Sequence, residues 1–150
     1  AARMPSDGIA DGANAPHEAH APAGILGLAG VILWTAADRF AAMRDFYAHT
    51  LGLAPRSLRD DFVSFDWGAS DPRAPRLTIT VHSQLDGGAR DPLRVMVNLE
   101  VDDIEATHAR LEASGASFVR PPEREHFGGW VATFEDPDGN LVQLLEQPRD

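Results

Sequence analysis

The chain repeats one pattern of structural signals at an offset of 63 to 66 residues. In both copies an apolar strand pattern precedes an amphipathic helix pattern that ends at a glycine, and further strand patterns follow. The equivalent pairs are Val31 and Val97, Gly52 and Gly115, and Leu77 and Val142. An internal repeat decides the fold before any single motif does, because each copy is one supersecondary unit. The sequence therefore predicts an α+β fold of two βαβββ modules, forming a curved mixed sheet around a cup.

The expected elements follow from apolar periodicity and from turn residues. In the first module, about 25–90, we expect strands over 30–35, 54–58, 61–68 and 76–83 and a helix over 38–53. In the second module, about 91–150, we expect a strand over 94–101, a helix over 102–115 and strands in "ASFVRPP", "WVATFED" and "NLVQLLEQ". A helix covers one face of each sheet, so the other faces can enclose a concave space suited to a small molecule.

The composition excludes several classes of function. The 150 residues include no cysteine, which rules out thiolate nucleophiles, cysteine-ligated metals and disulfides. All 13 basic residues are arginine, so lysine Schiff-base chemistry is excluded as well. The formal net charge of −10 works against binding to nucleic acid. No apolar run reaches the roughly 20 residues that span a bilayer, and no secretory signal is visible, so we expect a soluble, cytoplasmic protein.

Residues 1–24 have the composition of an extended arm, rich in Ala, Gly, Pro and Asp and without apolar periodicity. We expect this arm to precede a single domain over 25–150 and to lie across its own body or a neighbouring chain. A homodimer is the expected assembly. His17, Glu18 and His20 lie close together in the arm, but they lack the i,i+4 histidine spacing of a zinc-protease helix.

Three segments carry a resemblance to a known family: "DFYAHTLGL" (45–53), "VNLEVDDIEATHARLEASGA" (97–116) and "FEDPDGNLVQLLE" (134–146). With these segments in this order, the chain resembles the vicinal oxygen chelate superfamily of glyoxalases, bleomycin-resistance proteins and extradiol dioxygenases from about Val31 to Glu146. The same fold serves metal enzymes and metal-free binding proteins, so it assigns no activity by itself. We interpret Phe46, Tyr47 and Leu51 as core residues and "DPDGN" as a structural turn.

The resemblance also implies where a metal would be held. Metal-dependent members typically place His, Gln or Glu at four cup-facing positions, which correspond here to Gly30, Thr78, Met96 and Gln143. Glycine offers no ligand, and a thioether or a threonine hydroxyl binds Mg, Mn, Fe(II) or Zn weakly. Gln143 alone cannot hold a divalent ion against water. The resemblance thus implies a cup without a metal, and we expect no other cofactor.

Strand alternation predicts which side chains face the cup. If Val97, Leu99 and Val101 pack beneath the helix, then Met96, Asn98 and Glu100 face the cup. Together with the loop that precedes the seventh strand, the same argument gives the expected ligand contacts, which are Trp34, Met96, Asn98, Glu100, His126, Trp130 and Gln143. Aromatic, thioether and amide groups suit a flat, partly apolar molecule. The two tryptophans could instead plug the cup.

Two further alternatives stay open. The "EHFGGW" stretch (125–130) is either a mobile lid that carries His126 as an acid or base, or a hairpin turn that uses glycine for its backbone freedom. A one-residue slip of a strand would exchange its two faces. In that case a displaced metal site could use His82, His126, Glu100 and Glu146.

The leading hypothesis is a metal-free small-molecule-binding protein similar to the bleomycin-resistance branch, with an acidic surface that favours cationic ligands. The alternative is an enzyme of the same fold, a lyase, isomerase or dioxygenase, using a displaced divalent metal or none. A third hypothesis is a dimerisation unit with a plugged cup.

Overall fold

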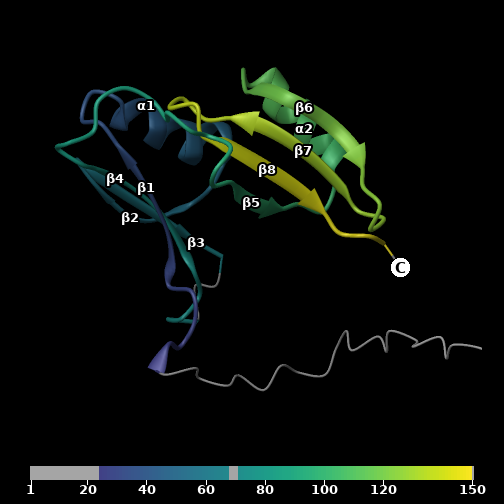
Figure 1. Ribbon diagram of the computed structural model, residues 1–150, viewed down its shortest axis with the longest axis horizontal. Helices are drawn as coiled ribbons and strands as arrows, with labels where there is room; N and C mark the ends of the chain where they lie inside the picture. Colours follow the sequence, from purple (N-terminus) through teal and green to yellow (C-terminus); the bar gives the residue numbers. More distant parts are fainter. Residues whose placement is uncertain (1–23, 68–70, 150) are drawn as a thin grey trace, which may run out of the picture.

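The computed structural model describes residues 24–67 and 71–149 and contains two four-stranded mixed sheets that lie side by side (Figure 1). The first sheet has the order β1-β4-β3-β2, and the second has the order β5-β8-β7-β6. The strands of the first are β1 (Gly30–Thr35), β2 (Pro55–Arg59), β3 (Phe62–Asp66) and β4 (Arg76–Val81). Those of the second are β5 (Val97–Glu100), β6 (Ser117–Arg124), β7 (Trp130–Glu135) and β8 (Leu141–Glu146). The predicted pair of βαβββ modules is confirmed.

The register of the strands reproduces the sequence repeat. Val31 of β1 lies opposite Leu77 of β4, and Val97 of β5 lies opposite Val142 of β8, with both pairs of strands parallel. These are the equivalent positions that the repeat predicted. Their side chains lie in the core or pack against it, so the predicted division of each strand into a core face and an open face is confirmed for β1, β4, β5 and β8.

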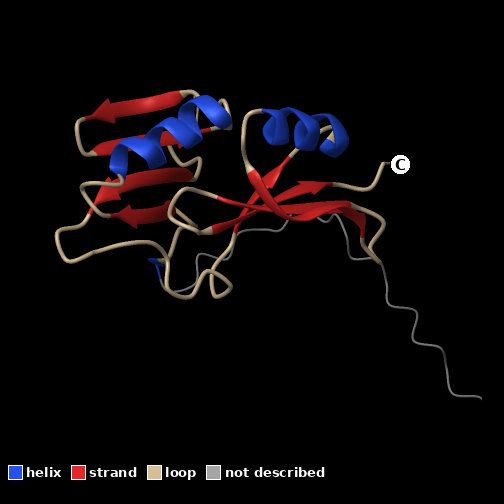
Figure 2. Ribbon diagram, turned by 90° about the horizontal axis from the view of Figure 1, so that it is seen from above, coloured by secondary structure: helices blue, strands red, loops and turns tan. Residues whose placement is uncertain are grey.

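Each helix covers one face of its own sheet (Figure 2). The first begins as α1 (Phe40–Asp45) and continues as the π-helical turn η2 (Phe46–Thr50), where the Leu51 amide donates to the Phe46 carbonyl at 2.8 Å. The second, α2 (Ile104–Ala113), begins at Asp103, whose side chain accepts from the Ala106 amide at 3.0 Å and caps the helix. Within the described residues, none of the helices is long and apolar enough to cross a membrane.

One hydrophobic core joins both modules. The buried residues of the first helical segment, Phe40, Met43 and Tyr47, share a cluster with Phe134 of β7. Phe46 packs at the border, with its ring centroid 6.0 Å from that of Phe134. The interpretation of Phe46, Tyr47 and Leu51 as core residues is therefore confirmed.

The fifth strand is shorter than the 94–101 predicted from its apolar run. A turn occupies Asp91–Arg94, where the Arg94 amide donates to the Asp91 carbonyl at 3.3 Å and the Arg94 guanidinium donates to the Asp91 carboxylate at 2.9 Å. The strand consequently begins at Val97, and Met96 lies just before it. Val97 pairs with Val142, close to the first residue of β8, so the residues before Val97 lie beyond the paired part of that strand.

The turn between β7 and β8 is organised by the buried carboxylate of Asp136. One of its oxygens accepts the backbone N–H groups of Asp138 and Asn140, both at 2.9 Å. The other accepts the Asn140 amide and the Tyr47 hydroxyl, both at 2.8 Å. The "DPDGN" segment is thus a structural turn, as predicted, and Tyr47 fastens it to the first module. Burial raises the pKa of the Asp136 carboxyl and outweighs the hydrogen bonds that lower it.

A second carboxylate of the same turn strengthens this connection. Asp138 is 6 % exposed, accepts the Thr35 hydroxyl at 2.7 Å and forms an ion pair with the Arg39 guanidinium. Arg39 also donates to the Pro137 carbonyl at 2.8 Å. We call the contacts of Asp136 and Asp138 with Tyr47, Thr35 and Arg39 the inter-module polar cluster.

Replacing Thr35 by valine should lower the free energy of unfolding by about 1–3 kcal/mol, because it leaves a buried carboxylate oxygen of Asp138 without its donor. Thr80→Val is the matched control, since its hydroxyl donates at 3.0 Å to the Asp61 carbonyl in an exposed bond. Urea unfolding of both variants measures the difference. Equal losses would contradict a stabilising role for the buried bond.

Candidate functional site

Two cavities lie in the space between the modules. The strand-side cavity, of about 510 Å³, opens between the start of the first sheet and the start of β5. The helix-side cavity, of about 650 Å³, opens between η2, α2 and β5. Both are lined by Trp67, Asn98 and Leu99. We call the two together the inter-module cleft.

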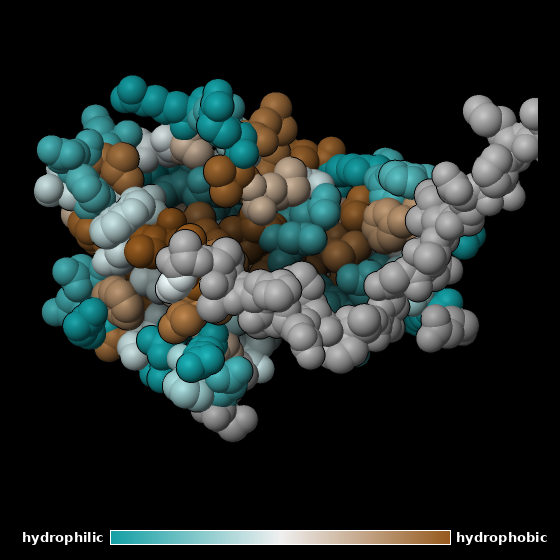
Figure 3. Space-filling view, turned by 60° about the horizontal axis from the view of Figure 1, so that its bottom comes forward, coloured by the Kyte–Doolittle hydropathy of each residue, from teal (hydrophilic) through white to brown (hydrophobic). Residues whose placement is uncertain are grey.

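The strand-side cavity is lined mainly by apolar side chains. Its walls come from the segments before and within β1, from the start of β4 and from Val95 to Leu99. Several of these side chains are open to solvent, including Leu28 (66 % exposed), Val95 (68 %) and Trp67 (61 %). Figure 3 shows hydrophobic residues gathered in a hollow in the middle of one face of the molecule, between polar flanks.

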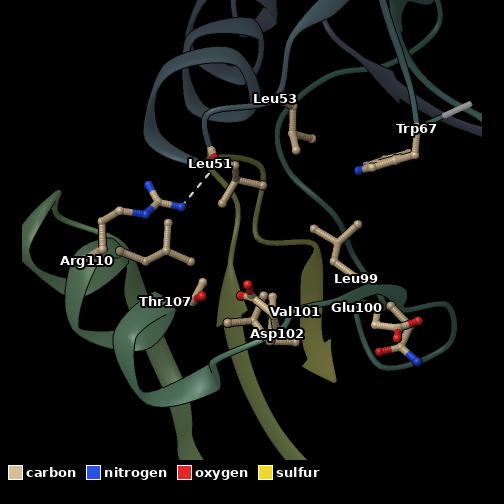
Figure 4. Close-up of a pocket in the computed structure, with 12 residues that line it drawn as sticks. Leu51, Leu53, Trp67, Leu99, Glu100, Val101, Asp102, Thr107 and Arg110 are labelled. Atoms are coloured by element: carbon tan, nitrogen blue, oxygen red, sulfur yellow. Dashed lines mark hydrogen bonds between the residues drawn. The ribbon is translucent and has the colours of Figure 1, made fainter. Parts of the chain in front are cut away.

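The helix-side cavity has an apolar floor and a polar rim (Figure 4). Leu111 and Leu144 are buried at its base, while Glu100, Asp102 and Thr107 contribute polar groups. Arg110 of α2 closes one end by donating to the Thr50 and Leu51 carbonyls at 3.0 and 3.3 Å. Arg110 thereby satisfies carbonyls that the helical segment leaves free at its C-terminal end.

The backbone of β5 forms part of the wall. It is the edge strand of its sheet and pairs with β8 on one side, so its other side is turned away from the sheet. The residues from Asn98 to Asp102 follow one another along the helix-side cavity.

The structure brings some of the predicted ligand contacts together. Met96 and Asn98 line the strand-side cavity, and Glu100 lines the helix-side cavity. Gln143 lies next to Asn98 in the register of β8 and donates to its side-chain oxygen at 3.2 Å. Four of the seven predicted residues thus lie in or beside the cleft.

The other three lie elsewhere. Trp34 is at the far end of β1, edge-on to His82 with ring centroids 5.2 Å apart, and lines a smaller cavity of about 420 Å³ beneath the loop 84–90. The prediction that Trp130 faces the cup is wrong, because Trp130 shares the core face of β7 with Ala132 and Phe134. Neither tryptophan is among the described residues that line the inter-module cleft.

His126 lies at the tip of the β6–β7 hairpin. The Glu125 amide donates to the Gly129 carbonyl at 2.8 Å, and the Gly128 amide donates back to the Glu125 carbonyl at 2.9 Å. Gly128 has a φ of 92°, as a three-residue hairpin loop requires. The structure therefore supports the hairpin interpretation of "EHFGGW" and leaves His126 exposed at a turn.

The residues present do not fit the metal that the fold family implies. A side chain at Gly30 would overlap the Arg76 carbonyl oxygen and lie 2.9 Å from the Arg76 nitrogen, so the glycine is required by the close approach of β1 and β4. Thr78 of β4 offers only a weakly binding hydroxyl, Met96 only a thioether, and Gln143 is bonded to Asn98. Among the described residues, no group of three or more His, Asp or Glu side chains could hold a metal ion, so the displaced site is not supported. The His17–His20 cluster lies outside the described residues.

Arg76 and Trp67 line the cleft but were not predicted as ligand contacts. Alternation along β4 could have placed Arg76 on the open face, because Leu77 and Ile79 are buried and the residue before Leu77 must face the other way. Trp67 carried no such signal, since it follows the last residue of β3 and leaves the strand geometry.

Gly30→Ala should lower the free energy of unfolding by about 1–3 kcal/mol more than Gly27→Ala, because the added methyl group overlaps backbone atoms only at position 30. The two glycines share a φ of 154°, so the control carries the same backbone strain. Chemical denaturation measures both. Equal effects would show that the approach of β4 does not require a glycine.

Known proteins resemble this chain in sequence and in fold. The family model described as "Glyoxalase/Bleomycin resistance protein/Dioxygenase superfamily" matches residues 33–144. An uncharacterized protein of Shewanella frigidimarina is 43 % identical over 53 residues, which span 35 % of this chain and 38 % of that protein.

Two solved structures show the likeness in fold. One is a glyoxalase/bleomycin resistance protein/dioxygenase from Nocardioides, with a TM-score of 0.63 and 20 % identity over 82 % of this chain and 84 % of that one. The other is a lactoylglutathione lyase from Agrobacterium tumefaciens, with a TM-score of 0.59 and 20 % identity over 80 % and 92 %. The family match covers most of the chain, and the two modules have the corresponding fold. The chain belongs to the glyoxalase/bleomycin resistance protein/dioxygenase superfamily.

Proposed function

We propose that the protein binds a small, partly apolar molecule in the inter-module cleft and that binding needs no metal. The observation that carries this proposal is an apolar cavity beside the four positions where the resemblance places a metal. Of these, Gly30 and Met96 line the strand-side cavity, Thr78 and Gln143 are not among its lining residues, and Gln143 is bonded to Asn98.

The size and lining of the cleft suit such a ligand. Its cavities of about 510 and 650 Å³ lie within the range of roughly 300–1,000 Å³ found for small-molecule sites. Trp67 offers a broad ring face and Met96 an adaptable thioether, while Asn98 can orient a polar group. The alternative is an enzyme of the same fold, and its form with a displaced metal gains no support from the described residues, because they supply no cluster of metal donors.

A fluorescence titration with N-phenyl-1-naphthylamine, a neutral probe that brightens in apolar surroundings, tests the proposal. We expect saturable one-to-one binding that is unchanged by a chelator. Met96→Glu should weaken it about tenfold or more, because a carboxylate would then have to be buried beside the probe.

Val119→Glu is the matched control, since Val119 is an exposed apolar residue on β6, outside the residues that line the cleft. The Val119→Glu variant should bind N-phenyl-1-naphthylamine with the same affinity as the unsubstituted protein. A requirement for added Mn, Ni or Zn, or equal losses in the two variants, would count against the proposal.

The homodimer expected from the sequence stays a prediction. It is supported by apolar side chains that are open to solvent in single copies of the chain, among them Leu26 (75 % exposed) and Leu93 (77 %). Light scattering of the purified protein should give twice the mass of the chain. A Leu93→Glu variant should shift the mass towards that of a monomer, and a monomeric mass for the unsubstituted protein would contradict the prediction.

A further inference from the structure

Arg76 is a charged residue in the lining of a cavity that is otherwise apolar or neutral, and it also lines an adjoining cavity of about 360 Å³. It is the first residue of β4, and its amide donates to the Ala29 carbonyl at 3.1 Å, which fixes the backbone at the cavity wall. Among the described residues that line the strand-side cavity, Arg76 is the one with a charged side chain. Asn98 is the other polar member of the lining.

The charge of Arg76 is not neutralised within the described part of the chain. Asp66 lies opposite Arg76 in the register of β3 and β4, but its carboxylate is paired with Arg56 at 2.6 Å. The Asp66 side chain is 10 % exposed and is thus held in that pair. Arg76 itself forms no ion pair with another described residue.

The polar groups of the cavity are hydrogen-bond donors. A guanidinium group presents N–H groups in a planar fork and has no acceptor. The side-chain oxygen of Asn98 is occupied by the Gln143 amide, while the N–H groups of Asn98 donate to no other described residue. Two donors facing an apolar space match the oxygens of a carboxylate, for which a guanidinium is the preferred bidentate partner.

The acidic surface of the protein does not prevent a carboxylate ligand from binding in the cavity. The formal net charge of −10 is spread over the whole chain and is screened over about 10 Å at ordinary ionic strength. A contact at ion-pair distance lies well within that screening length, so salt weakens it without abolishing it.

Resting on the proposed function, we infer that the ligand of the strand-side cavity is an amphipathic anion, with a planar carboxylate held by Arg76 and Asn98 and an apolar, aromatic body held by Trp67 and Met96. This reverses the ligand charge expected from overall composition. The local donors decide the class of ligand, and the net charge affects only the approach from solution.

Isothermal titration of three matched probes tests the inference: 1-naphthoate, its neutral amide 1-naphthamide and the cation 1-naphthylmethylammonium. On the unsubstituted protein, 1-naphthoate should bind about tenfold or more tightly than 1-naphthamide, and the cation most weakly. The preference for 1-naphthoate should fall as salt is raised.

Arg76→Gln should remove the preference by weakening 1-naphthoate about tenfold while leaving 1-naphthamide unchanged. Arg124→Gln, at an exposed arginine of β6 outside this cavity, removes the same charge and should leave all three affinities unchanged. Circular dichroism and the unfolding temperature show whether both variants are folded. If a variant fails to fold, the comparison of the three probes on the unsubstituted protein still tests the inference.

The outcomes separate the two proposals. If 1-naphthamide or the cation binds the unsubstituted protein as tightly as 1-naphthoate, or if Arg76→Gln keeps the preference, the inferred anion is wrong while the binding function stands. If none of the three probes and not even N-phenyl-1-naphthylamine binds, the proposed function fails together with the inference.

Discussion

The arrangement of the two modules depends on the inter-module polar cluster. Asp136 and Asp138 are 4 % and 6 % exposed, and a buried carboxylate is costly unless donors surround it. Tyr47, Thr35 and Arg39, which supply those donors across the module boundary, all belong to the first module. The carboxylates of the β7–β8 turn therefore have all their hydrogen-bond donors only when the second module packs against the first.

The cleft exists because the two sheets stay separate. β1 and β5 are both edge strands, and each is paired only with the last strand of its own module. Apolar side chains from both modules line the gap, and they remain partly open to solvent where no strand covers them. Arg110 bridges the gap on the helix side, through the carbonyls of Thr50 and Leu51. The polar contacts thus hold the modules together, while the apolar surface between them remains partly exposed to solvent.

The sequence was informative wherever a residue's neighbours along the chain determine its environment. The repeat predicted both modules, and alternation placed Val31, Val97 and Val142 on the core side. Sequence patterns did not predict the position of residues whose surroundings depend on contacts distant in sequence. Trp67 reaches the cleft from a segment beyond its strand, whereas Trp130 was misplaced even though alternation along β7 puts it on the core face with Ala132 and Phe134. β5 is shorter than predicted because its pairing with β8 begins at Val97 opposite Val142, a partner that periodicity along the chain does not reveal.

Gly30 limits the routes by which this protein could have changed during evolution. Where β1 runs so close to the backbone of Arg76, no side chain fits without displacing β4. A histidine at this position would therefore cost stability before it could supply a donor. A metal-binding side chain here would require the main chains of both strands to move apart together, so a substitution at Gly30 alone does not create a donor position.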